Sequence, residues 1–136
     1  MHILKVERAE KLGALRENPY FENLSQADLE HLADCTSLRA FERAETIFFE
    51  GDACSNLHIQ QTGCSKLYRL SPQGRQYIVR LAQERDTFNE VSVFDGGTNP
   101  VNAEALEAGR IWVTEADCLR RGRAACVQGA EQCRRT

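Results

Sequence analysis

The sequence predicts a mainly β fold with flanking helices, in which a sandwich or barrel-like roll follows two short helices. Three observations support this fold. Apolar residues follow a helical spacing only as far as Cys35, and from Thr36 onward they form short β-type runs. Turn-forming residues separate these runs at regular intervals, which is typical of a sandwich or a barrel-like roll. With 136 residues, of which 42% are hydrophobic, the chain is long enough for one domain with a buried core.

The two helices are predicted at the front of the chain. Residues 6–17 place apolar side chains at helical spacing, and Asn18-Pro19 ends this helix because the residue before a proline avoids helical angles. The second helix is predicted to begin at Ser25, whose hydroxyl can accept from the first backbone N–H groups, with Asp28 three residues later. It should end near Cys35. Each helix then has an apolar face that must pack on another element.

The β-type runs define the predicted strands. They lie at residues 38–41, 46–49, 57–59, 64–70, 76–82, 103–107 and 110–114. Ser71-Pro72-Gln73-Gly74 has proline and glycine in turn-forming places, so the two runs beside it should form a hairpin. The last two runs are predicted to pair with each other across Ala108-Gly109. The chain contains no internal repeat and no low-complexity linker.

The stretch from Asp86 to Leu106 fits neither a plain strand nor a plain helix. An apolar run at 88–94 contains one acid, Glu90, and the breaker Gly96-Gly97 follows it. A short helical turn that ends on glycines leaves backbone N–H groups free to bind an anion, and the acid adds an acceptor for a hydroxyl. An ordinary loop between two strands explains the same residues. From this stretch alone both interpretations stay open.

Charge and hydropathy exclude several classes of protein. The net charge is −3 and the pI is about 5.6, whereas a domain that binds nucleic acid by itself usually has a strong positive excess. The N-terminal residues are charged where a secretory signal needs an apolar run, and no apolar run approaches the length that spans a membrane. We therefore expect a cytoplasmic protein with no membrane partner.

The cysteines and histidines predict neither a metal site nor catalysis. None of the six cysteines forms a C-x-x-C pair, so reduced thiols are expected, with no disulfide framework and only a weak signal for an iron–sulfur site. His58 is predicted to be a packed side chain. It is also the one histidine of three that falls in the β region, which excludes a β-roll metalloenzyme with several histidine ligands. No base is marked beside a cysteine nucleophile.

An ordered series of motifs resembles the cyclic-nucleotide-binding domain of the Crp–Fnr family of bacterial transcription regulators. The series covers roughly residues 15–121, and its members are Glu50-Gly51-Asp52, Leu57-His58-Ile59, Gly63, Lys66-Leu67-Tyr68-Arg69, Gly74-Arg75, Asp86, Phe88 and Glu90. The resemblance implies an antiparallel jelly-roll of about eight strands, with helices before it and a long helix after it. It also identifies residues 88–103 with the family's phosphate-binding cassette.

The cassette of family members that bind cyclic AMP opens with Phe-Gly-Glu, and the glutamate accepts from the ribose 2′-hydroxyl. Glu90 stands at that place, but Asn89 replaces the glycine. At the far end those members have an arginine that pairs with the cyclic phosphate, then serine or threonine, then alanine. Counting back from Ala103, this sequence has Val101 and Asn102 instead. The binding residues implied by the resemblance are Phe88, Asn89, Glu90, Val91, Ser92, Asn99, Val101, Asn102 and Ala103.

The missing arginine argues against tight binding of a cyclic nucleotide. No arginine or lysine lies between Asp86 and Gly109, whatever the register of the alignment. A buried phosphate without its charge-assisted partner is worse off by roughly 3–5 kcal/mol, which is a factor of several hundred or more in affinity. Cyclic AMP or cyclic GMP is therefore not expected to bind at ordinary strength. The sequence does not identify another small-molecule effector.

Three parts of the chain are predicted: helices at 1–35, the β-roll at 36–114, and the start of a C-terminal helix with an irregular tail at 115–136. The tail has no apolar stripe for a coiled-coil dimer and is too short for a helix-turn-helix, so DNA would be bound only through a domain absent from this chain. A truncated regulator is one expectation. Whether a homodimer forms is open. Two non-enzymatic functions follow: an effector domain with a degenerate cassette, or a protein-interaction module with a vestigial pocket.

Overall fold

The computed structural model describes residues 1–89, 93 and 95–121, and within them the chain is mainly β. In order along the chain, the elements are β1 (His2–Leu4), α1 (Arg8–Glu17), η1 (Pro19–Phe21), α2 (Gln26–Asp34), β2 (Thr36–Phe41), β3 (Thr46–Phe48), β4 (Asn56–Thr62), β5 (Ser65–Leu70), β6 (Gln76–Ala82), β7 (Thr87–Phe88), β8 (Asn102–Ala105), β9 (Gly109–Glu115) and α4 (Ala116–Arg121). The predicted helices are confirmed within two residues, and Ser25 caps α2 by accepting from Asp28 N at 3.2 Å. β1, η1 and β7 have no counterpart among the predicted elements.

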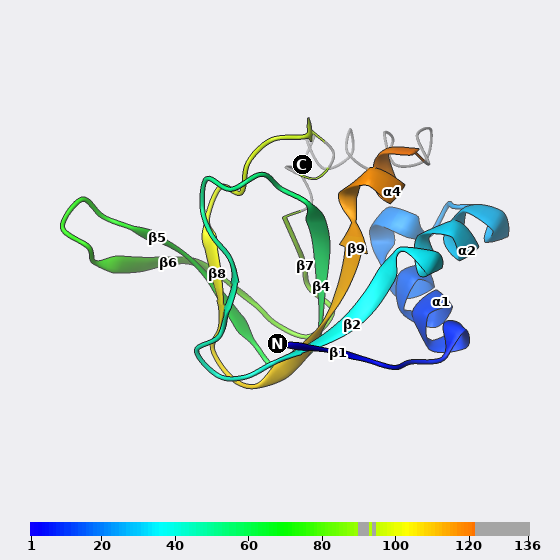
Figure 1. Ribbon diagram of the computed structural model, residues 1–136, viewed down its shortest axis with the longest axis horizontal. Coiled ribbons are helices and arrows are strands. Elements are labelled where there is room, and N and C mark those ends of the chain that lie inside the picture. The colour runs from blue at the N-terminus through cyan, green and yellow to red at the C-terminus, as the bar shows by residue number, and fades with distance from the viewer. Residues whose placement is uncertain (90–92, 94, 122–136) are drawn as a thin grey trace.

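The strands form two antiparallel sheets, which confirms the predicted jelly-roll. One sheet has the order β1-β2-β9-β4-β7, and the other has the order β3-β8-β5-β6. Helices α1 and α2 lie together on one side of the five-stranded sheet (Figure 1). The hairpin of β5 and β6 projects from the opposite end of the molecule (Figure 1). This hairpin and its turn at 71–74 are as predicted.

Side chains alternate between the two faces of the five-stranded sheet, so a hydrophobic core lies on each face. Leu57 and Ile59 of β4 pack with Trp112 of β9 against the helices, in a cluster that also contains Leu15 and Leu29. The second cluster lies between the sheets and includes Phe41, Leu67, Phe88, Ile111 and Val113. The intervening residues of β4 therefore face the interior of the roll, which is the space that a ligand of this fold could enter.

The predicted pairing of the last two strands is wrong. β8 pairs with β3 and β5, whereas β9 pairs with β2 and β4 in the other sheet. The chain changes sheet across residues 106–108, and Gly109 then passes so close to β4 that an added Cβ would lie 2.3 Å from the Thr62 carbonyl oxygen. Two adjacent β-type runs with a glycine turn look alike whether they form a hairpin or cross between sheets.

The prediction of reduced thiols is also wrong for one pair. Cys35 and Cys118 form a disulfide, although they are 83 residues apart in the sequence. They flank the end of the β2–β9 ladder, where Thr36 pairs with Thr114, and this register brings their Cα atoms to 6.4 Å. Cys54 and Cys64 carry thiols as predicted, and the remaining two cysteines lie outside the described residues.

Candidate functional site

A cavity of about 280 Å³ opens between the two sheets, where β2, β3 and β4 approach the two ends of the cassette. Aromatic, amide and charged side chains share its wall. They are Arg39, Phe41, Thr46, Ile47, Phe48, Phe49, Asp52, Ala53, Ser55, Asn56, His58, Asn89 and Asn99. The wall therefore combines flat apolar surfaces with groups that donate or accept hydrogen bonds, as small-molecule sites do.

His58 is the most deeply buried polar group of this wall. It is 5% exposed, and its ring stacks on Phe88 at 5.1 Å between centroids and lies 5.1 Å from Phe48. Burial lowers its pKa to about 3, with a further contribution from the positive charge of Arg39, so the imidazole is neutral at physiological pH. Its Nδ1 atom is buried and has no hydrogen-bond partner in the structure. The prediction of a packed histidine is confirmed, and its unpaired Nδ1 atom is buried within the wall.

Arg39 supplies a positive charge to the same cavity from outside the cassette. It lies on β2, lines the cavity, and its Nε donates to Ser37 Oγ at 3.2 Å. Sequence reasoning missed this residue because it searched for a cation only between residues 86 and 109. The sequence signal that could have identified Arg39 was its charge inside the otherwise apolar run at 38–41. It stands two residues before Phe41, so both side chains lie on the same side of the strand.

Asn89 and Asn99 connect the two ends of the cassette. Asn89 adopts a positive φ of 73°, a conformation that asparagine tolerates and that suits its place at a family glycine. Its Nδ2 donates to Asn99 Oδ1 at 2.7 Å and contacts Cys54 Sγ at 3.2 Å. Asn99 Nδ2 in turn donates to the Phe49 carbonyl at 3.0 Å. Asn89 Oδ1 is buried without a partner, so it is a second unpaired polar atom on this cavity.

The other predicted binding residues lie elsewhere. Phe88 and Ala103 are buried in the cluster between the sheets, and Val101 packs against that cluster. Asn102 Oδ1 accepts from the backbone N–H of Glu50 at 2.9 Å. The predicted residues Glu90, Val91 and Ser92 lie outside the described residues. Of the described set, the structure brings only Asn89 and Asn99 to this cavity, and their role in binding stays a prediction.

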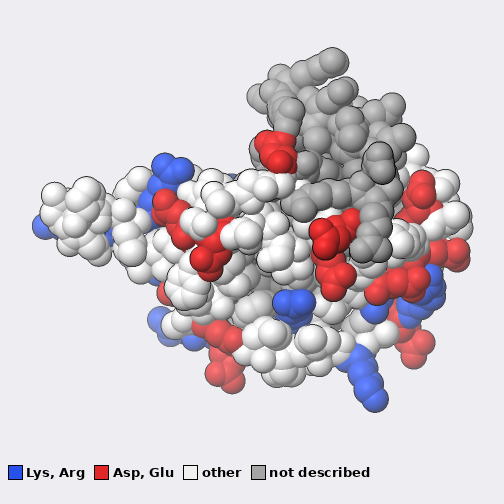
Figure 2. Space-filling view, turned by 45° about the horizontal axis from the view of Figure 1, so that its top comes forward, with Lys and Arg blue, Asp and Glu red and all other residues white. Residues whose placement is uncertain are grey.

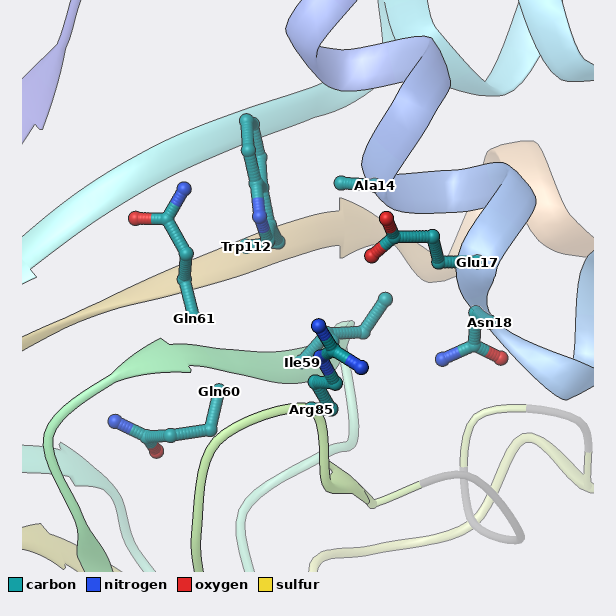
Figure 3. Close-up of a pocket in the computed structure, with 8 residues that line it drawn as sticks. All are labelled: Ala14, Glu17, Asn18, Ile59, Gln60, Gln61, Arg85 and Trp112. Atoms are coloured by element: carbon teal, nitrogen blue, oxygen red, sulfur yellow. The ribbon is translucent and has the colours of Figure 1, made fainter.

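A second cavity of about 340 Å³ lies on the helix side of the five-stranded sheet. Figure 3 shows its wall, with Glu17 at the end of α1 and Arg85 pointing toward the same space beside Trp112. None of the predicted binding residues lines it. Both unpaired buried polar atoms of the described residues belong to the first cavity, which is therefore the better candidate for a ligand site.

The face of the described residues shown in Figure 2 gives no sign of a nucleic-acid interface. On the face in Figure 2, acidic and basic side chains are intermixed over the described part, without a continuous basic area. No helix in this part of the chain has the length and apolar character needed to span a membrane. The first cavity is thus the feature of the described chain that most resembles a binding site.

Comparison with known proteins gives a consistent result. Residues 38–125 match the family model described as "Cyclic nucleotide-binding domain". The "CRP-like cAMP-activated global transcriptional regulator" of Mycobacterium tuberculosis is 32% identical over 80 residues, which cover 59% of this chain and 36% of that protein. The "Cyclic AMP receptor protein" of Thermus thermophilus is 24% identical over 68% of this chain and 43% of that protein. The chain therefore spans well under half the length of these curated relatives.

Solved structures share the fold. The sensor domain of the transcriptional regulator DNR from Pseudomonas aeruginosa has a TM-score of 0.82 and 24% identity, covering 92% of this chain and 84% of that one. The N-terminal domain of a transcriptional regulator from Streptomyces coelicolor has a TM-score of 0.72 and 26% identity, covering 88% of this chain and 85% of that one. In both comparisons the matched region covers nearly the whole of this chain.

Proposed function

Because the chain belongs to the family of cyclic nucleotide-binding domains, we propose that it is the ligand-sensing domain of a Crp–Fnr-like transcription regulator. The curated relative from Mycobacterium tuberculosis is a CRP-like transcriptional regulator, and the DNR sensor domain covers nearly the same length of chain. We assign no catalytic role to this domain. It works in the cytoplasm, and it reaches DNA through a helix-turn-helix domain on a longer chain or a partner.

One observation carries the proposal: the two residues whose buried polar atoms are unpaired line the same cavity as a cation. His58 Nδ1 and Asn89 Oδ1 have no partner, and Arg39 lines the same wall. A buried polar atom without a hydrogen bond costs about 1–3 kcal/mol, so a ligand gains that free energy for each of these atoms that a shift of the wall brings into contact with it. The ligand that fits this wall is a small polar molecule, because Arg39 offers it a positive charge and Asp52 a negative one.

We further propose that cyclic AMP and cyclic GMP bind weakly. No arginine or lysine lies from residue 86 to 109, and the hydrogen bond from Asn89 Nδ2 to Asn99 Oδ1 joins two uncharged groups at the ends of the cassette. Arg39 comes from β2 and replaces part of the missing charge. An effector other than a cyclic nucleotide is then the natural occupant.

Calorimetric titration of the full chain with cyclic AMP and cyclic GMP tests the weakness of binding. We expect dissociation constants weaker than roughly 100 μM, because the loss of several kcal/mol moves a micromolar site into that range. Glu90→Ala tests the cassette, and Glu107→Ala, which removes an exposed acid outside it, is the matched control. Micromolar binding that Glu90→Ala abolishes and Glu107→Ala preserves would overturn the proposed weakness and leave an ordinary cyclic-nucleotide sensor.

A second candidate function is supported by the projecting hairpin. Leu70, Tyr77, Ile78, Val79 and Leu81 are between 39% and 56% exposed, so both faces of β6 present large apolar side chains to solvent. In Figure 2 the projection is mostly uncharged. Apolar surface of this kind marks protein-interaction sites. If Tyr77→Ser with Val79→Ser abolishes self-association measured by light scattering while Arg39→Gln does not, the interaction module is favoured.

A further inference from the structure

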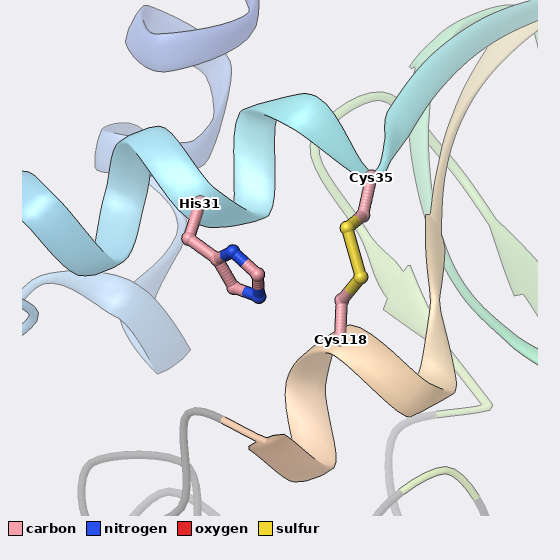
Figure 4. Close-up of side chains that lie close together, drawn as sticks. All are labelled: His31, Cys35 and Cys118. Atoms are coloured by element: carbon pink, nitrogen blue, oxygen red, sulfur yellow. A yellow bond between two sulfur atoms is a disulfide. The ribbon is translucent and has the colours of Figure 1, made fainter.

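Helices α2 and α4 meet at a cluster of three side chains that the cassette does not include. Cys35 follows the last residue of α2, His31 lies one turn earlier on the same helix, and Cys118 lies on α4. Figure 4 shows the His31 ring on the side of α2 that faces the disulfide. The ligand atoms of the three residues all lie within 4.8 Å of one another. An imidazole and two sulfur atoms therefore converge at one point between two helices.

We propose that His31, Cys35 and Cys118 form a Zn²⁺ site in the reduced chain, and that the disulfide replaces this site when the two thiols are oxidised. Thiolate sulfur and imidazole nitrogen are the preferred ligands of zinc. His31 and Cys35 stand four residues apart, a spacing that places both on one face at the end of a helix. Cys118 completes the set from the facing helix, as the ligands of interhelical metal sites do.

The fourth coordination position has a nearby donor. Glu115 Oε2 lies 3.9 Å from Cys118 Sγ, at the junction of β9 with α4. His31 and Glu115 are both exposed, so the outer side of the cluster is open to solvent. Zinc can therefore enter from that side, and Glu115 or a water molecule fills the position that the three residues leave open.

The sequence predicted no metal site because it contains no C-x-x-C pair. Here the two cysteine ligands come from segments 83 residues apart.

The two states interconvert by thiol–disulfide chemistry. A dithiol reductant supplies two electrons and two protons, its own sulfur atoms become a disulfide, and Cys35 and Cys118 become thiols. Zinc then binds the two sulfurs as thiolates and displaces their protons. In the reverse direction hydrogen peroxide takes two electrons from the two thiolates and two protons from solvent, its O–O bond breaks to give two water molecules, the S–S bond forms, and zinc is released.

Either state holds α4 in place. At the end of the β2–β9 ladder, the hydroxyl groups of Thr36 and Thr114 form a 2.8 Å hydrogen bond. Beside it, Glu115 N donates to the Cys35 carbonyl at 3.2 Å. The cluster lies directly beyond these bonds. A zinc ion or a disulfide therefore fixes the first turns of α4 to α2, whereas the metal-free dithiol leaves these hydrogen bonds, the one from Ala116 N to the Ser55 carbonyl, and the local packing. The inference does not depend on which ligand the roll binds.

Cobalt titration of the reduced full chain, under anaerobic conditions, tests the site. We expect one equivalent of Co²⁺ to bind with a thiolate charge-transfer band and the visible bands of tetrahedral coordination, and Zn²⁺ to displace it. Cys35→Ser, Cys118→Ser and His31→Gln should each weaken binding at least tenfold. The controls are Cys54→Ser, Cys64→Ser, and the double change of Cys126 and Cys133 to Ser, with circular dichroism to confirm folding.

Three outcomes would overturn the proposal. They are the absence of stoichiometric cobalt binding, unchanged cobalt binding in His31→Gln, and loss of cobalt binding in the control that changes Cys126 and Cys133.

Peroxide treatment of the zinc-loaded chain tests the exchange. We expect zinc to appear in solution, measured with a chromophoric chelator, while peptide mapping finds Cys35 joined to Cys118. A dithiol reductant should then restore cobalt binding to one equivalent. Retention of zinc after both thiols are oxidised, or pairing of either cysteine with a different partner, would contradict the inference.

Discussion

Asn89 Nδ2 donates a 2.7 Å hydrogen bond to Asn99 Oδ1, and this bond joins the two ends of the cassette. Asn99 is 4% exposed and is also anchored to the Phe49 carbonyl, so its side chain is held in one position on the cavity wall. An amide pair here provides polar contacts but no charge. We therefore expect the site to favour a ligand that needs less anion stabilisation than a cyclic phosphate bound by an arginine.

Restoring a cation at position 99 should increase the affinity for cyclic AMP. Asn99 lines the cavity, whereas Val101 packs against the cluster between the sheets. We expect Asn99→Arg to tighten binding roughly tenfold to a hundredfold, because a charge-assisted contact to phosphate contributes about 1.5–3 kcal/mol. Val101→Arg, the control, should give no gain. Calorimetric titration measures both, and a gain with Val101→Arg alone would place the family arginine at 101, as counting back from Ala103 predicts.

Folding stability should depend on pH through His58. Its pKa is about 3 in the folded chain, because burial disfavours the imidazolium, and about 6.5 in the unfolded chain. Between these values the unfolded state binds more protons, so the free energy of unfolding falls as the pH falls from 6.5 toward 3. Near pH 5 the loss should be about 2 kcal/mol.

Urea denaturation of the wild type and of His58→Phe, at pH 7.5 and near pH 5, checks this dependence. Phenylalanine can keep the stack on Phe88 and the contact with Phe48 but has no group to titrate. The variant should therefore lose less stability than the wild type between the two pH values, by about 2 kcal/mol. Equal losses in the two proteins would show that His58 does not control the acid sensitivity.

Gly109 should tolerate no side chain. An added Cβ would lie 2.3 Å from the Thr62 carbonyl oxygen and 3.0 Å from Gly63 Cα, and both of these atoms belong to the backbone. Gly109→Ala should lower the free energy of unfolding by roughly 2–3 kcal/mol, since β4 and β9 must move apart. Gly13→Ala is the matched control, because Gly13 lies in α1 with nothing within 4 Å of the added carbon.

That control should instead gain about 0.5–1 kcal/mol, the usual difference between glycine and alanine inside a helix. Thermal unfolding of the two variants beside the wild type measures both changes. Similar melting temperatures for the two variants would mean that the backbones of β4 and β9 separate without cost.

Asn18 should stabilise the junction between the helices and the roll. Its Nδ2 donates to Thr87 Oγ1 at 2.7 Å, and its Oδ1 accepts from Tyr20 N at 2.9 Å, while the residue is 4% exposed. Asn18→Ala should cost roughly 1–3 kcal/mol, because it leaves buried partners unpaired. Asn23→Ala, at an exposed position, should change the free energy of unfolding by less than about 0.5 kcal/mol. Denaturant titration distinguishes them, and equal effects would remove the special role of Asn18.

Local patterns predicted most of the elements and the family. Ser25 and Asp28 marked the start of α2, the turn at 71–74 marked the hairpin, and the ordered motifs identified a cyclic nucleotide-binding domain. These signals are short in sequence, because caps, turns and alternation depend on neighbouring residues. The absence of arginine and lysine from residues 86–109 was equally visible, since it needs only a count.

The sequence by itself determined the class of fold, the family and the absence of a cation within the cassette. Only the tertiary structure decided that β8 and β9 belong to different sheets, that Arg39 and His58 face the cassette, and that Cys35 meets Cys118. Each of these relationships joins residues that are distant in the chain or share a face through strand register. Such contacts depend on which strands pair and on where the chain crosses between sheets, and a linear pattern of apolar residues carries no information on either.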